Sequence, residues 1–189
     1  MVLDPGADRR GPLSRDGVFP LTPLGGKRYQ VGRTDMAKFP TEVERSIPVA
    51  APMAEVYRFL WDVVGSSSCI PGIDSCEPAG ADTYRFVYKE VSTGPVSMVV
   101  RYTARYKGNG KDRIEFEGIA AEGDNTDVSG TIRLEPSGKG ATRIVLHQTL
   151  APDTPVPRLV QGLIRSFVQS QAATEIENYL KRVKAALEA

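Results

Sequence analysis

The feature that most constrains this chain is a long row of apolar residues near its C-terminus, spaced like one face of an α-helix. The row comprises Val160, Ile164, Val168, Ala172, Ile176, Leu180 and Val183, and Val156, Leu159, Leu163 and Phe167 widen it at its start. About 30 residues at 1.5 Å each give a helix of roughly 45 Å, which is long enough to cross a whole sheet. The outer side of its second half is expected to carry Glu175, Glu177, Lys181, Arg182 and Lys184.

The segments before this helix alternate apolar and polar residues, which is typical of strands with one buried face. The alternation predicts strands over residues 41–49, 84–88, 96–104, 114–116, 128–134 and 144–150. Pro52 begins a helix at a first-turn position, and its apolar stripe runs to Val64 before Gly65–Ser68 ends it. Short links such as Lys107–Lys111, which contains an Asn-Gly pair, indicate an antiparallel order.

This order of elements predicts an α+β helix-grip architecture, with a curved antiparallel sheet wrapped around the long C-terminal helix. The sheet must cover its apolar face, and only the last helix is long enough to do so. Where inner side chains do not meet the helix, a gap lined by apolar and aromatic groups remains. Such a gap has the usual composition of a small-molecule pocket.

The first 40 residues differ from the rest of the chain. They hold five prolines and six glycines and show no sustained apolar period. Such a segment buries too little apolar surface to offset its ordering entropy. We therefore expect a flexible N-terminal tail over residues 1–40 and one domain over residues 41–189.

Composition excludes several classes of function. The 24 Lys+Arg and 23 Asp+Glu residues give a net charge of +1 without a dense basic run, so no nucleic-acid partner is expected. No segment approaches the roughly 20 apolar residues that cross a bilayer, and the N-terminus lacks a signal-peptide pattern. These observations favour a cytoplasmic protein and leave peripheral contact with the inner membrane face open. Cys69 and Cys76 match no metal or redox spacing and His147 is the sole histidine, so no metal and no cofactor is expected.

The candidate ligand-binding residues are those that fall on the inner faces of the expected elements. The aromatic candidates are Phe59, Tyr84, Phe86, Tyr88, Tyr102, Phe116 and Phe167, and the others are Glu90, Met98, Val100, Gln148 and Leu163. The sequence leaves open whether each ring fills the core or lines the pocket. Tyrosine hydroxyls and the Gln148 amide are suited to orient an otherwise apolar ligand, because a buried hydroxyl needs a partner.

The sequence offers no clear catalytic group. Gly65–Cys69 lacks the final glycine of a serine-hydrolase elbow and follows a helix. No glycine-rich phosphate-binding motif occurs. The strand alternation predicts that His147 points outward. Glu90 continues an inward series, which places it either at the cavity rim or in solvent at a strand end. No catalytic residue is assigned.

Several features resemble the SRPBCC superfamily, and most closely the carbon-monoxide-dehydrogenase G-subunit family. They are the order of elements, the Ile70–Pro78 segment leading to Asp82–Arg85, the later Gly94-Pro95-Val96, and the long final helix. The resemblance covers roughly residues 41–187 and implies the helix-grip fold of START lipid-transfer domains and the birch pollen allergen. It also implies a cavity for lipids, quinones or polyketides. In the carbon-monoxide-dehydrogenase branch it implies a helper that attaches a molybdenum hydroxylase to the membrane or serves its electron-acceptor chemistry.

Three hypotheses follow from the residues and the resemblance. The first is non-catalytic binding or carriage of a hydrophobic small molecule, with a redox enzyme as a further partner. The second is a polyketide cyclase, aromatase or hydrolase that works in the same cavity through Glu90 and a tyrosine. The third is a surface-interaction protein with a collapsed cavity, which docks through residues 1–40. We favour the first, and the question of enzymatic activity stays open.

Overall fold

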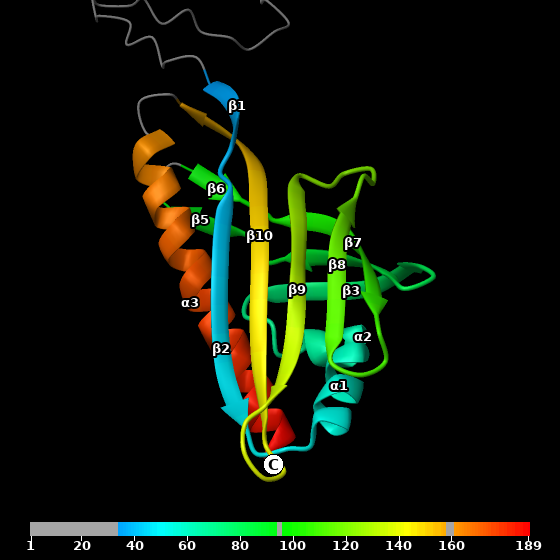
Figure 1. Ribbon diagram of the computed structural model, residues 1–189. Coiled ribbons are helices and arrows are strands. Elements are labelled where there is room, and N and C mark those ends of the chain that lie inside the picture. The colour runs from blue at the N-terminus through cyan, green and yellow to red at the C-terminus, as the bar shows by residue number, and fades with distance from the viewer. Residues whose placement is uncertain (1–33, 94–95, 158–160) are drawn as a thin grey trace, which may run out of the picture. The chain divides into compact units, whose positions relative to one another are not determined.

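The structure is a computed structural model that describes residues 34–93, 96–157 and 161–189. Its helices are α1 (Met53–Trp61), α2 (Val63–Ser67) and α3 (Gln161–Leu187). Its strands are β1 (Thr34–Lys38), β2 (Thr41–Val49), β3 (Ile73–Gly80), β4 (Thr83–Tyr88), β5 (Val91–Thr93), β6 (Val96–Met98), β7 (Arg101–Gly108), β8 (Arg113–Ile119), β9 (Thr126–Pro136) and β10 (Thr142–Pro157). The long helix α3 follows all the strands in the chain and lies beside them (Figure 1).

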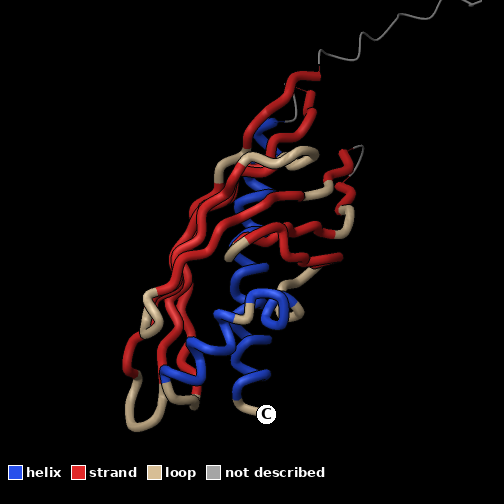
Figure 2. The backbone as a smooth tube through the Cα atoms, turned by 90° about the vertical axis from the view of Figure 1, so that its right-hand side faces the viewer, coloured by secondary structure: helices blue, strands red, loops and turns tan. Residues whose placement is uncertain are grey.

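One antiparallel sheet contains eight of these strands, in the order β1, β10, β9, β8, β7, β4, β3, with β2 also paired to β10. The long strand β10 joins both N-terminal strands, because Thr142–Leu150 pairs with β2 and Asp153–Pro157 pairs with β1. The sheet bends, and α3 runs along its inner side (Figure 2). This arrangement confirms the expected α+β fold. No helix of the described ranges is long and apolar enough to cross a membrane.

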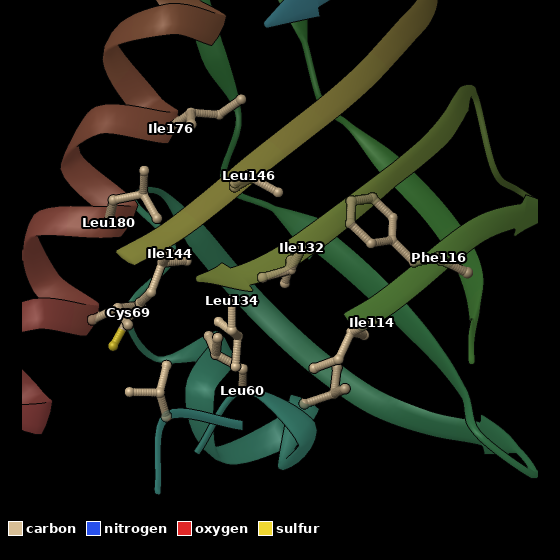
Figure 3. Packing of buried hydrophobic residues seen from close by; sticks show 14 of the residues in the cluster. Leu60, Cys69, Ile114, Phe116, Ile132, Leu134, Ile144, Leu146, Ile176 and Leu180 are labelled. Carbon is tan, nitrogen blue, oxygen red and sulfur yellow. The ribbon is translucent and has the colours of Figure 1, made fainter. Parts of the chain in front are cut away.

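The core lies between the second half of α3 and the sheet. Figure 3 shows Ile176 and Leu180 of α3 beside Ile144 and Leu146 of β10. Val183 is fully buried one turn further along the helix. Two polar contacts hold the same part of α3 to β2. Arg45 Nε donates to Glu177 Oε1 at 3.0 Å, and Lys184 Nζ donates to the carbonyl oxygen of Pro48 at 2.8 Å.

The expected boundary at residue 40 is wrong for the described part of the tail. Thr34–Lys38 form β1 and pair with β10, and Phe39 is only 1% exposed. The backbone NH of Phe39 donates to the carbonyl oxygen of Pro152 at 3.1 Å. Burial of this ring and pairing with β10 therefore place residues 34–40 in the domain. Residues 1–33 lie outside the described residues, so their part of the prediction stays a prediction.

The helix expected up to Val64 is divided in two at Asp62. The Asp62 carboxylate accepts from the backbone NH of Gly65 at 3.1 Å, which caps a new helix. Gly65–Ser67 therefore lie in α2, although the sequence analysis predicts that they end a helix. A Cβ at Gly65 would overlap the Asp62 carboxylate, so the cap favours glycine at this position.

Other strands also differ from expectation. The strand expected over residues 96–104 breaks after Met98, because the Asn125 side chain accepts from the NH of Arg101 and donates to the carbonyl oxygen of Val99. The edge strand β3 was missed because its proline, glycine and register shifts hide the alternation. The sequence analysis places Val156 at the start of the long C-terminal helix. In the structure Val156 belongs to β10 and pairs with Asp35 of β1.

Candidate functional site

A cavity of about 150 Å³ lies between α3 and the inner face of the sheet. Strands β2, β4, β7, β8, β9 and β10 contribute side chains to its wall, together with the turn at Ile70 and Pro71. The alternation of these strands sends every second side chain to the inner face. The first part of α3 contributes Val168 and Ala172. The wall is therefore largely apolar, as the sequence analysis expects of a gap between sheet and helix.

Five of the candidate residues line this cavity. They are Tyr88, Val100, Tyr102, Phe116 and Gln148. Four of them lie on strands β4, β7, β8 and β10, and Val100 lies just before β7. The fold of the sheet thus brings together side chains that are far apart in the sequence.

Four other candidates lie outside the cavity wall. Phe86 is 1% exposed and stacks on Tyr102, its register partner, with ring centroids 4.9 Å apart, so it packs beside a residue of the wall. Tyr84 packs edge-on against Tyr106, and Phe59 packs against the core. Glu90 is exposed and accepts a hydrogen bond from the Ser97 hydroxyl. Of the two positions expected for Glu90, the structure thus has the solvated one and not the cavity rim, because β4 ends at Tyr88 and its inward series ends there too.

The remaining candidates, Met98, Leu163 and Phe167, have side chains outside the described residues. His147 lies on the outer face of the sheet, as its strand alternation predicts. Its Nε2 lies 2.8 Å from Glu42 Oε1. Among the described residues, no three His, Cys, Asp or Glu side chains gather as metal ligands.

The wall also includes residues that the sequence analysis does not name as candidates, among them Tyr106, Tyr179 and Glu175. Tyr106 continues the alternation of Tyr102 and Ala104 along β7, so extending that strand by two residues would have found it. Tyr179 and Glu175 lie on α3 beside the apolar row. Glu175 was expected on the outer side of the helix, and this expectation is wrong. The cavity wall is broader than the single row, so the neighbouring positions face it as well.

The tyrosines of the cavity are held in their neutral form. Burial raises the pKa of Tyr88 to about 12, although the hydrogen bond with the Tyr102 hydroxyl 3.3 Å away acts to lower it. Burial also raises the pKa of Tyr102 and of Tyr106 well above 10, and raises that of Tyr179. These phenols are therefore hydrogen-bonding groups near neutral pH and do not serve as bases.

A curved antiparallel sheet around a C-terminal helix, with an apolar cavity between them, defines the START-like, helix-grip class of proteins. Within that class, the chain belongs to the family described as polyketide cyclase / dehydrase and lipid transport, which matches residues 40–188. This membership agrees with the resemblance to the SRPBCC superfamily. The closer resemblance to the carbon-monoxide-dehydrogenase G-subunit family stays a prediction. Among curated proteins, none matches the chain.

Solved structures share the fold. The Zhui aromatase/cyclase from Streptomyces sp. R1128 is 18% identical with a TM-score of 0.60, over 79% of this chain and 94% of that one. A START superfamily protein from Mycobacterium smegmatis is 16% identical with a TM-score of 0.56, over 78% and 97% of the two chains. The lipid transfer and protein localization domain of human StarD13 is 14% identical with a TM-score of 0.50, over 77% and 76%. At these identities the likeness establishes the fold alone.

Proposed function

We propose that this protein binds a compact, hydrophobic, ring-containing molecule in the cavity between α3 and the sheet, and that it holds or carries this molecule without changing it. The observation that carries the proposal is an apolar cavity whose wall includes neutral phenol groups. Apolar walls supply most of the binding free energy, and a few polar groups fix the orientation of the ligand. Family membership supports a hydrophobic ligand in general, because the family description names polyketides and lipids.

The size of the cavity limits the ligand. An apolar cavity of about 150 Å³ in another protein takes up benzene, whereas pockets for drug-sized molecules occupy roughly 300–1,000 Å³. The cavity here is about 150 Å³. A ligand of one or two rings suits this volume, and a longer lipid or a polyketide would require the first part of α3 to move away from the sheet.

Binding is favoured over catalysis because the acid/base pair required by the cyclase hypothesis is not in the cavity. Glu90, the proposed acid or base, is exposed and bonded to Ser97. The cavity tyrosines keep their protons near neutral pH, because burial raises their pKa values. A cyclase would need another base, and Glu175 is the carboxylate that the described cavity wall offers. Glu90→Gln should therefore leave any turnover of a polyketide-like substrate unchanged.

The direct test is to look for a bound molecule. Detergent-free protein should be purified and studied by native mass spectrometry, before and after extraction with organic solvent. We expect a mass difference and an apolar compound in the extract. An empty protein that also takes up neither quinones, fatty acids nor 2-naphthol would contradict the proposal.

A variant that fills the cavity provides the second test. Ala172 lines the cavity from α3, so Ala172→Phe should place a ring where the ligand lies. We expect 2-naphthol affinity, measured by titration calorimetry, to fall at least about tenfold, the effect of roughly 1.4 kcal/mol. Ala185→Phe makes the same change at an exposed position of α3 and should leave binding unchanged. Equal affinity in both variants would place the binding site elsewhere.

The accessory role beside a molybdenum hydroxylase and recruitment to the membrane remain part of the proposal, on the strength of the sequence resemblance alone. Copurification of a molybdenum-containing enzyme with the full chain would support the former role.

A further inference from the structure

The polar groups of the cavity fall into those that have a partner and those that have none. The hydroxyls of Tyr88 and Tyr102 lie 3.3 Å apart and satisfy one another in part. Glu175, on α3, lines the same cavity. Among the described residues its carboxyl group has no hydrogen bond and no ion pair. Glu175 is thus a half-buried carboxylate on a largely apolar wall, with no partner among the described residues.

An unpartnered carboxyl group in such a place lowers the stability of the protein. Removal of a carboxylate from water without a hydrogen bond costs free energy, which is why most buried charges are paired. The pKa of Glu175 reflects this cost, since burial raises it. The charge of Glu175 also raises the pKa of Tyr88, so the carboxyl group lies within electrostatic reach of the hydroxyl pair. The acceptor and the two phenols therefore form one polar corner of the cavity.

Lys89 also lines the cavity but does not neutralise Glu175. It is exposed just after β4, and within the described ranges its ammonium group forms no ion pair with the Glu175 carboxylate. The other described acidic residues in this part of the chain are engaged elsewhere, because Glu177 pairs with Arg45 and Glu188 pairs with Lys184. Glu175 is the helix carboxylate that remains for a ligand.

We infer that Glu175 determines the specificity of the cavity, and that the bound molecule is an aromatic compound with a hydroxyl or amine group that donates a hydrogen bond to the Glu175 carboxylate. This inference rests on the proposed function, since it concerns the ligand of the same cavity. An ionised carboxylate only accepts hydrogen bonds, so it favours a donor and disfavours an ether or a carbonyl oxygen. A hydroxyl group and an amine group can each donate the hydrogen bond that Glu175 would accept.

A pair of matched probes tests the inference. 2-Naphthol and 2-methoxynaphthalene share their ring system, but only the former can donate a hydrogen bond. Titrations should be run at pH 8, well above the ordinary pKa of a glutamate, because the proposed contact requires the ionised Glu175 carboxylate. We expect the full-length protein to bind 2-naphthol about tenfold more tightly than 2-methoxynaphthalene, as a hydrogen bond to a charged group allows.

The variant Glu175→Gln should reduce this preference to roughly twofold or less and leave the affinity for 2-methoxynaphthalene almost unchanged. Glu177→Gln, two positions along the same helix, should keep the preference of the unmodified protein. Glu175→Met provides a second variant without any strong acceptor, and it should abolish the preference. Far-UV circular dichroism checks that each variant folds.

The outcomes separate the inference from the proposed function. If both probes bind equally well, or if Glu175→Gln and Glu175→Met keep the preference for 2-naphthol, the role of Glu175 is overturned and the cavity function stands. If neither probe binds the unmodified protein, the proposed function for compact aromatic ligands fails, and the inference fails with it.

Discussion

The hydroxyl pair of Tyr88 and Tyr102 links the cavity to the stability of the protein. Because burial raises the pKa of Tyr88 from 10 to about 12, the folded chain keeps a proton that the unfolded chain releases above pH 10. This contribution to the free energy of unfolding is complete below pH 10 and is lost as the pH rises towards 12. The cavity phenols thus predict a protein whose free energy of unfolding falls above pH 10.

Urea unfolding at pH 8 and at pH 11 measures this effect. At pH 11, one pH unit above the ordinary pKa, Tyr88 alone should account for a loss of about 1.4 kcal/mol. Between pH 8 and pH 11 the free energy of unfolding of Tyr88→Phe should therefore fall by about 1 kcal/mol less than that of the unmodified protein. Tyr57→Phe, which changes a tyrosine of α1 outside the cavity, should follow the unmodified protein. Equal losses in all three proteins would contradict the assignment.

The residues of the site differ in how well the sequence predicts them. On strands, alternation fixes the face, so Tyr88, Tyr102 and Gln148 could be placed correctly from the pattern alone. On α3, the boundary between inner and outer faces depends on how far the sheet bends, which no local pattern records. Glu175 was misplaced for this reason. The charge of Glu175 indicated a solvent-exposed side chain. The cavity wall, however, is wide enough to include its position on α3.

At the scale of elements, the close approach of β9 to its neighbours depends on Gly130. A Cβ at this position would overlap the Phe116 ring and the backbone carbonyl oxygen of His147. Gly130→Ala should therefore lower the free energy of unfolding by roughly 1–3 kcal/mol, the usual effect of overpacking. Because Phe116 lines the cavity, the same variant should also weaken binding of 2-naphthol.

Gly162→Ala is the matched control for this prediction. It lies in the first turn of α3, and a Cβ there would meet nothing within 4 Å. Alanine favours helix over glycine, so stability should stay equal or rise by up to about 1 kcal/mol. Chemical denaturation of both variants measures the difference. An equal loss of stability in the two would indicate a general effect of removing glycine.

The boundaries of elements were less predictable than their order. The order of strands and helices follows from periodicity, and it is confirmed. The breaks depend on single polar side chains from other parts of the chain or from the preceding turn. Asn125 binds the backbone at Val99 and Arg101 across 26 and 24 positions, and Asp62 starts α2. Polar contacts of this kind, whether tertiary or local, override the apolar pattern and leave no periodic signal.

At the scale of the molecule, the start of the domain can be tested by truncation. A chain that begins at Thr34 keeps β1 and the buried Phe39, whereas a chain that begins at Thr41 loses both. The free energy of unfolding of the shorter chain should be lower by about 2 kcal/mol, which is the contribution of burying one large apolar side chain. Thermal unfolding should show a Tm several degrees lower for the chain from Thr41. The same Tm for both chains would mean that residues 34–40 contribute nothing to stability.

The order of synthesis has a consequence for the long closing helix. Every strand of the sheet is translated before the 27 residues of α3. At about 5–20 residues per second, the ribosome needs seconds to make them. During that interval the inner surface formed by residues such as Ile132 and Leu146 faces water, where a nascent chain is prone to aggregate or to meet a chaperone. During the same interval the proposed hydrophobic ligand can reach the inner face of the sheet without obstruction by α3. Ligand binding and the final folding step can therefore occur together.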